Sequence, residues 1–127
     1  MTLPLKQATG GVYSDMLNPT AKQKQSHVAA CLAETQGPII ATTDYVRAFA
    51  DQIRAFVPRR YVVLGTDGFG RSDTREKLRR FFEVDRYYVA IAALKALADE
   101  DTLPATKVAE AIKKYGIDPA KPAPWTV

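Results

Sequence analysis

The sequence contains very few of the side chains that most often build catalytic and metal sites. Its 127 residues include a single cysteine, Cys31, and a single histidine, His27. One cysteine excludes an internal disulfide bond, and the pair offers no metal-ligand spacing. We interpret Cys31, on the apolar stripe of a predicted helix, as an inert core thiol, and His27 as solvent-exposed or capping. Scarce cysteine is also typical of a reducing compartment, which predicts a cytoplasmic protein.

Long apolar runs and a strong charge of one sign are missing as well. A membrane-spanning helix needs about 20 apolar residues, and no run approaches that length. Residues 1–8 lack the apolar centre of a signal peptide. The net charge of +4 is modest, and the basic residues alternate with acidic ones without interleaved aromatics. The sequence therefore predicts neither a membrane nor nucleic acid as a partner.

What remains is an ordinary globular composition, 46% hydrophobic and 25% charged, in a chain long enough for one core. We expect a weakly structured segment at residues 1–25, an α/β domain at residues 26–118 and a proline-rich, extended tail at residues 119–127. Within the first segment only residues 11–13 could add a strand, and a very short one. Trp125 in the tail is expected to pack onto the domain or onto a partner surface.

The most informative stretch is YVVLGTDGFGRSDT, residues 61–74. Its first four residues form a β-branched and apolar run that indicates a buried strand. The turn-rich segment that follows contains three glycines, Gly65, Gly68 and Gly70. Asp73 stands three residues before Glu76, a capping-box pattern that opens a helix. In α/β folds such a corner of strand, loop and helix is where ligands and partners gather.

The candidate functional loop leaves two interpretations open. It consists of Asp67, Gly68, Phe69, Gly70, Arg71, Ser72 and Asp73. Its G-x-x-G-x-G spacing differs from the dinucleotide fingerprint, and no Gly-Lys-Ser/Thr follows as in a P-loop. Backbone amides at the helix start could still hold an anion beside Arg71. We favour the alternative, in which the glycines serve only a tight connection between strand and helix.

Hydrophobic periodicity predicts a second strand and several helices. Residues 38–42 form the first strand, and a helix over residues 44–57 with a clean apolar stripe connects it to the central strand. Two strands joined in this way make a βαβ unit with a parallel pair. Further helices are expected from Ser26 to Gly37, after Asp73, from Arg86 to about Ala98, capped by Asp85, and from Pro104 to Tyr115.

Two of these helices carry expectations about their surfaces. The helix over residues 86–98 is apolar on nearly every side, so it should be largely buried. The helix after the loop has a basic face that we expect to face water, although it could meet a phosphate or an acidic partner. That face consists of Arg75, Lys77, Arg79 and Arg80.

Residues 65–74, followed by LRRFFEVD at residues 78–85, resemble the C-terminal domain of homodimeric bacterial pyruvate dehydrogenase. Residues 38–45 and 50–54 also fit the family pattern, and the similarity runs from about Asp15 to the C-terminus. The resemblance implies a truncated doubly wound α/β domain of the transketolase C-terminal type, with a mainly parallel sheet and flanking helices. Residues 1–14 do not match the family, and the strand that begins the family's sheet lies upstream of this chain.

The resemblance also implies what the chain does. The parent enzyme decarboxylates pyruvate oxidatively and transfers the acetyl group to lipoyl groups. Its thiamine diphosphate and magnesium are held by two other domains, which also supply the catalytic residues. We therefore expect a structural and subunit-interface module, catalytically silent alone and without a cofactor of its own. The implied partners are a second copy, as a dimer or larger species, the enzyme's other domains and the lipoyl acetyltransferase component. The alternative is a small stand-alone module that binds an anion or phosphate ligand through residues 65–73.

Overall fold

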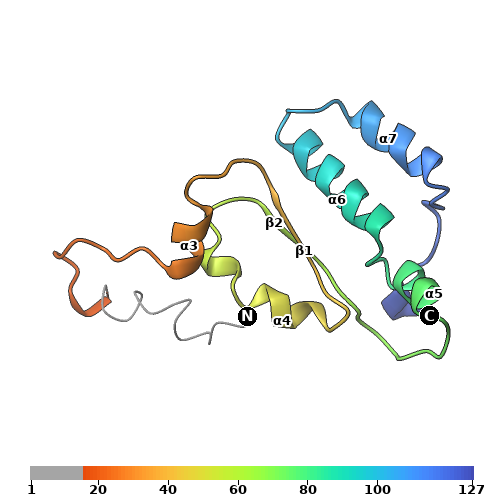
Figure 1. Cartoon of the computed structure of the whole chain (residues 1–127), viewed down its shortest axis with the longest axis horizontal. Helices are drawn as coiled ribbons and strands as arrows, with labels where there is room; N and C mark the ends of the chain where they lie inside the picture. Colours follow the sequence, from red (N-terminus) through yellow and green to blue (C-terminus); the bar gives the residue numbers. More distant parts are fainter. Residues whose placement is uncertain (1–15) are drawn as a thin grey trace.

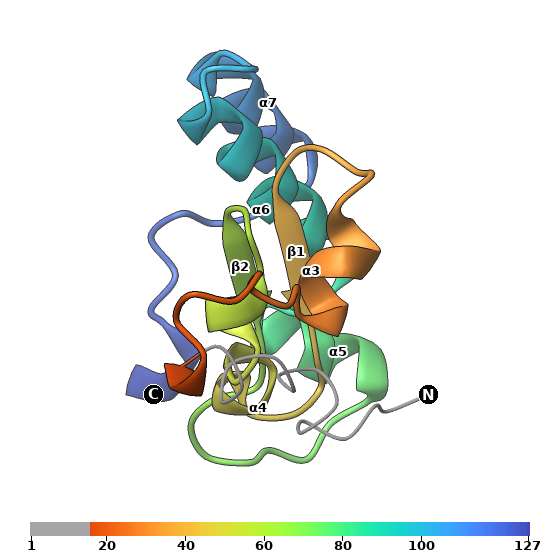
Figure 2. The same ribbon diagram turned by 90° about the vertical axis from the view of Figure 1, so that its left-hand side faces the viewer.

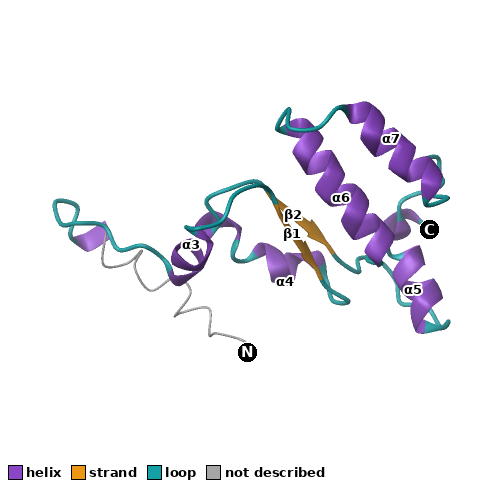
Figure 3. Cartoon of the chain, turned by 45° about the horizontal axis from the view of Figure 1, so that its top comes forward, coloured by secondary structure: helices purple, strands orange, loops and turns teal. Residues whose placement is uncertain are grey.

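The computed structural model describes residues 16–127, so the short strand considered at residues 11–13 lies outside the described part. The elements along the chain are α3 (His27–Leu32), β1 (Ile39–Thr42), α4 (Arg47–Asp51), the 3-10 turn η1 (Arg54–Phe56), β2 (Tyr61–Leu64), α5 (Arg75–Phe81), α6 (Arg86–Asp99), α7 (Ala105–Lys114) and the 3-10 turn η2 (Pro124–Thr126) (Figures 1 and 3). Within residues 16–127, no helix has both the length and the apolar character needed to cross a bilayer.

The two predicted strands form a parallel pair, as the βαβ pattern indicated. Ile39 stands opposite Tyr61, and the pairing continues in register to Thr42 and Leu64. The described residues form a sheet of two strands. The α/β class expected from the sequence is therefore confirmed, with a small parallel sheet and flanking helices.

Helices lie on both sides of this sheet. Figure 1 shows α6 on one side and α4 on the other, and Figure 3 shows the same arrangement in a tilted view. α6 packs against both strands and carries α7 on its far side. The Tyr61 hydroxyl donates a hydrogen bond to the Ala50 carbonyl of α4 at 2.9 Å, which joins the other side of the sheet to its helix. The buried apolar residues are Tyr61, Val63, Phe82, Val84, Ala96 and Val108.

The prediction of one long crossover helix over residues 44–57 is wrong. The segment folds instead as the short helix α4 and the turn η1, and Val46 and Phe49 of its apolar stripe are 39% and 58% exposed. A helix of 14 residues would be about 21 Å long, whereas a strand of four residues spans about 13 Å. A sheet this small cannot cover the whole stripe.

Two further expectations about burial are also wrong. Of the residues of α6, only Ala96 is fully buried, because the sheet and α7 cover only part of the helix surface. Cys31 is exposed on α3, a six-residue helix without buried residues, and its Sγ lies 3.4 Å from His27 Nε2. His27 is exposed, as expected.

The tail does not remain extended to its end. Figure 1 shows it running from the end of α7 to α5, and Figure 2 shows its end at the level of α4. Its last residues form η2, where Pro124 is buried and Trp125 is half exposed. On the way, the Lys121 ammonium donates to the Phe81 carbonyl at 2.7 Å and lies 3.2 Å from the Glu83 carboxylate. The tail thus packs onto the domain, one of the two positions considered for Trp125.

Candidate functional site

The candidate loop leaves β2 at the carboxyl end of the sheet, beside the segment that follows β1. The Thr66 amide donates to the Tyr45 carbonyl at 2.8 Å, which ties the two connections together. In a parallel sheet both strands end at this edge, so the loop, the start of α4 and the tail converge there.

Asp67 is the first member of the loop, and its carboxylate is occupied by α4. One oxygen accepts from the backbone amide of Arg47, the first residue of α4, at 3.2 Å. The other oxygen forms an ion pair with the Arg47 guanidinium. Partial burial acts to raise the pKa of Asp67, but the hydrogen bonds from Arg47 and its positive charge outweigh that effect and lower it. Asp67 therefore caps a helix distant in sequence.

Two of the three glycines are required by close contacts. A Cβ atom on Gly65 would lie 2.6 Å from the Arg47 Cγ. Gly68 has φ of +99°, and a Cβ there would lie 3.0 Å from the Trp125 Cα, so both its dihedral and its contact favour glycine. Gly70 has no positive φ, and no described residue lies within 4 Å of a Cβ placed there. The geometric interpretation of the glycines is thus supported at two positions and not at the third.

The other loop residues present little that could hold an anion. The Arg71 guanidinium stacks on the Phe81 ring at 4.1 Å from the centroid. The Asp73 carboxylate accepts from the Thr74 amide at 2.7 Å and adds negative charge at the start of α5. Phe69 projects from the loop with 86% of its surface exposed. The loop therefore displays an apolar side chain toward solvent.

The helix after the loop starts one residue later than the capping box indicated. Thr74 is the N-cap of α5, and its side chain accepts from the Lys77 amide. Asp85 caps α6 as predicted, accepting from the amides of Tyr87 and Tyr88.

The basic face of α5 faces water only in part. Arg75 and Lys77 are exposed, as expected. Arg79 reaches across to Asp44, with its Nη2 2.8 Å from the carboxylate. The hydrogen bond and the positive charge of Arg79 lower the pKa of Asp44 despite some desolvation. Arg80 turns inward, so the expectation of a solvated cation is wrong there.

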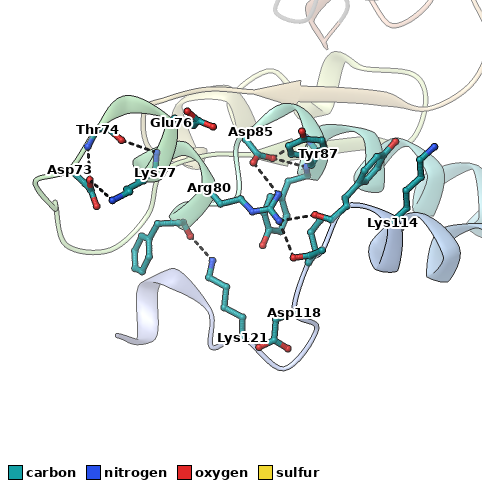
Figure 4. A pocket seen from close by; sticks show the side chains of 15 residues that line it. Asp73, Thr74, Glu76, Lys77, Arg80, Asp85, Tyr87, Lys114, Asp118 and Lys121 are labelled. Carbon is teal, nitrogen blue, oxygen red and sulfur yellow. Dashed lines mark hydrogen bonds and ion pairs between the residues drawn. The ribbon is translucent and has the colours of Figure 1, made fainter.

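Arg80 lies in a surface depression of about 980 Å³ between α5, the start of α6 and the end of α7 (Figure 4). Its guanidinium donates to the carbonyls of Tyr115 and Gly116 at 3.0 and 3.1 Å, and to Asp85 at 3.4 Å. Burial, with a contribution from Glu83, raises the pKa of Tyr88, which also lines the depression. The Arg80 charge stabilises the carbonyl end of α7, so Arg80 connects α5 to the end of α7. No sequence spacing links Arg80 to residues 115–116, so the sequence alone does not predict this contact.

The described residues do not fit a thiamine diphosphate–magnesium site. Within residues 16–127, no group of three or more His, Cys, Asp or Glu side chains is placed to hold a metal ion. The two loop carboxylates nearest the glycines are bound to Arg47 and to the start of α5. Magnesium bound to a diphosphate requires oxygen ligands that converge on it.

Comparison with known proteins supports the resemblance. A family model described as the transketolase-like TK C-terminal domain matches residues 14–85, which include the loop and α5. Three relatives, each named pyruvate dehydrogenase E1 component, come from Cupriavidus necator, Pseudomonas aeruginosa and Escherichia coli K12. They are 70% identical over 113 residues, 60% over 109 and 46% over 111. These alignments cover 89%, 85% and 87% of the chain, but only 13%, 12% and 12% of the relatives. The chain therefore spans about one eighth of their length.

Proposed function

The chain belongs to the family of transketolase-like TK C-terminal domains, and from that premise we propose that it is the structural and subunit-interface module of a pyruvate dehydrogenase E1-type enzyme. Its homology to the C-terminal part of E1 components confirms the resemblance noted in the sequence. In this proposal the chain supplies no catalytic group, and it positions and joins larger parts of the enzyme.

One observation carries the proposal: the loop's two carboxylates, Asp67 and Asp73, are bound within the chain, while large apolar side chains near the loop remain exposed. Phe69 is 86%, Tyr45 65% and Trp125 50% exposed. Exposed aromatic side chains with an adjacent arginine are typical of the centres of protein interfaces. Arg47 provides that arginine, with its guanidinium 4.6 Å from the Trp125 ring centroid. The site fits a contact surface better than a reaction centre.

The activity of the whole enzyme is part of the proposal. It is the oxidative decarboxylation of pyruvate with acetyl transfer to lipoyl groups, in the cytoplasm. Thiamine diphosphate and magnesium would be held by domains outside this chain, because the described residues do not form such a site. The proposed partners are those other domains, a second copy of the chain and the lipoyl acetyltransferase component.

The alternative of a stand-alone anion binder gains no support. Asp67 and Asp73 place negative charge at both ends of the loop, and Arg71 stacks on Phe81. α5 has only seven residues, so its amides offer a weak anion site.

A chimera tests the structural role directly. In the Cupriavidus necator relative, the matching segment is replaced by this chain, which is 70% identical to it. The chimera is expected to keep the relative's oligomeric state and its pyruvate-dependent turnover. An insoluble or monomeric chimera would contradict the proposed role.

Calorimetry on the isolated chain tests its catalytic silence. Thiamine diphosphate with magnesium is expected to give no saturable heat, and a pyruvate-dependent dye-reduction assay is expected to match buffer. Micromolar binding or turnover would place a real active site in these residues.

A further inference from the structure

We propose that the link between Asp67 and Gly68 is a site of spontaneous isoaspartate formation, and that the contact between Asp67 and Arg47 suppresses this reaction in the folded chain. Asp67 is the only aspartate in the sequence that is followed by glycine. The inference does not depend on the proposed function, because it concerns the covalent chemistry of the loop itself.

The reaction begins when the amide nitrogen of Gly68 attacks Cγ of Asp67. A bond forms between these two atoms, one C–O bond of the carboxyl group breaks, and water leaves with the amide proton. The product is a five-membered succinimide ring, which water then opens. Addition of water at the main-chain carbonyl of Asp67 leaves an isoaspartate, in which the backbone continues through Cβ and Cγ. One water leaves and one returns, so the reaction needs no oxidant and no reactant other than water.

The attacking nitrogen is available in this structure. Glycine has no Cβ atom and restricts its backbone least, so it leaves its amide nitrogen unobstructed. Among residues 16–127, no hydrogen bond uses the Gly68 amide. The state of the Asp67 carboxyl group therefore decides whether the ring can close.

Arg47 withholds that carboxyl group from the nitrogen. One oxygen of Asp67 accepts from the Arg47 backbone amide at 3.2 Å, and the other pairs with the Arg47 guanidinium. Ring closure requires a protonated carboxyl, because oxygen leaves the carbon as water, whereas a bound arginine stabilises the ionised form. Desolvation acts to raise the pKa of Asp67, but the hydrogen bonds and the charge of Arg47 lower it. Arg47 thus opposes both the rotation of this side chain and its protonation.

The tail restrains the backbone of the same link. A Cβ atom on Gly68 would lie 3.0 Å from the Trp125 Cα and 3.3 Å from the Pro124 carbonyl oxygen, so this part of the loop has little room to turn. The Arg47 guanidinium lies 4.6 Å from the centre of the Trp125 ring. Because Arg47 contacts both Asp67 and the tail, loss of its side chain would free the carboxyl group to turn toward the Gly68 nitrogen.

Isomerisation would change the loop permanently. An isoaspartate adds one methylene group to the main chain, so the close contact between Gly68 and the tail would no longer fit. Its carboxylate is attached directly to Cα, and the cap that Asp67 provides for α4 would be lost. A modified chain would therefore retain a covalent record that its loop had opened.

Peptide mapping tests the proposal on the unmodified chain. The folded chain and a free peptide of residues 61–71 are incubated separately at neutral pH for several weeks. Trypsin releases the same segment from the chain, and fragmentation in a mass spectrometer distinguishes isoaspartate from aspartate at position 67. The free peptide is expected to accumulate isoaspartate, and the folded chain at least about tenfold more slowly, because only the opened population reacts. Equal rates, or a peptide without isoaspartate, would overturn the proposal.

Variants test whether Arg47 provides the protection. Arg47→Met should raise the rate in the chain about tenfold, toward that of the free peptide. Arg75→Met, at an exposed position of α5, is the matched control for the lost charge. Arg80→Met weakens the contact between α5 and the end of α7 and is the control for lost stability. Both controls should keep the wild-type rate, and an Arg47→Met rate equal to theirs would contradict the proposal.

A conservative variant keeps the test decisive if Arg47→Met does not fold, which circular dichroism detects. Arg47→Lys retains the positive charge but lacks the Nε donor that pairs with Asp67. It is expected to form isoaspartate faster than the wild type and more slowly than the free peptide. A rate equal to that of Arg80→Met would show that the guanidinium does not protect Asp67 and would overturn the proposal.

Discussion

Gly68 of the loop lies directly against the backbone of Trp125 in the tail. A Cβ atom at position 68 would stand 3.0 Å from the Trp125 Cα and 3.3 Å from the Pro124 carbonyl oxygen. The Arg47 guanidinium covers the Trp125 ring and also pairs with Asp67. The loop, the first residue of α4 and the tail therefore form one connected unit. A substitution in one of these segments should alter the packing of the other two.

The glycine at position 68 should be intolerant of substitution. Gly68→Val combines a positive φ with a steric clash, and we expect it to lower the free energy of unfolding by about 1–3 kcal/mol. Gly70→Val is the matched control, because no atom of residues 16–127 lies within 4 Å of a Cβ there. Urea denaturation measures both. Equal losses for the two variants would show that the tail does not pack on Gly68.

Docking of the tail should be visible in fluorescence, because Trp125 is the only tryptophan. Gly68→Val should shift its emission toward that of a solvent-exposed indole while circular dichroism still reports folded helices. Arg47→Met removes the guanidinium from the ring and should cause a similar shift. An emission spectrum unchanged by both variants would contradict the packing of the tail against the loop.

Acid should weaken the contact between the loop and α4. The pKa of Asp67 is lower in the folded chain than its ordinary value. A carboxyl of this kind contributes stability above its unfolded pKa, near about 3.9, and that contribution is lost as the pH falls through the folded value. Asp67→Asn should lower the urea midpoint at neutral pH and flatten its decline below about pH 4. Glu110→Gln, at an exposed position of α7, is the control and should preserve the wild-type decline.

Arg80 should matter more than its neighbours on α5. Arg80→Met removes the donors to the end of α7, and we expect a loss of about 1–3 kcal/mol in the free energy of unfolding. Lys77→Met changes a side chain that is 73% exposed, and its effect should remain within about 0.5 kcal/mol. Thermal unfolding of both variants decides the matter. Similar melting temperatures would mean that Arg80 does not join the helices.

A substitution at Phe69 distinguishes an effect on assembly from an effect on folding stability. Phe69→Ser should leave the isolated chain within about 0.5 kcal/mol of the wild type, because the side chain is largely exposed. In the chimera with the Cupriavidus necator relative, the same change should weaken assembly, which sedimentation detects. An assembly unaffected by Phe69→Ser would remove this residue from the proposed interface.

Local patterns predicted the parts of the fold that depend on neighbours in sequence. The β-branched run at Tyr61–Leu64 became β2, and Asp85 became the cap of α6. The failures lie where distant segments decide the outcome. The length of α4 depends on how much sheet covers it, and Cys31 is exposed on α3, a helix without buried residues in the described part of the chain.

The candidate site also combines features that neighbouring residues predict with features that depend on distant segments. The turn-rich spacing predicted that glycine is required in the loop. The structure agrees at Gly65 and Gly68, where a Cβ atom would make close contacts. The reasons for it, Arg47 and Trp125, come from other segments that no spacing rule connects to the loop. The inward position of Arg80 is equally non-local, because its acceptors are backbone carbonyls, which every residue carries.

The contact between Gly68 and Trp125 also imposes an order on biosynthesis. The ribosome adds residue 68 to the chain well before residue 125. The new loop therefore lacks its contact with Trp125 while α6 and α7 are translated. The two strands, residues 39–42 and 61–64, can pair during that interval. The loop can reach its final shape only when the tail emerges and closes over it. A pause in translation just before the tail would therefore hold a chain with a formed sheet and an unfinished loop, open to proteases at that one corner.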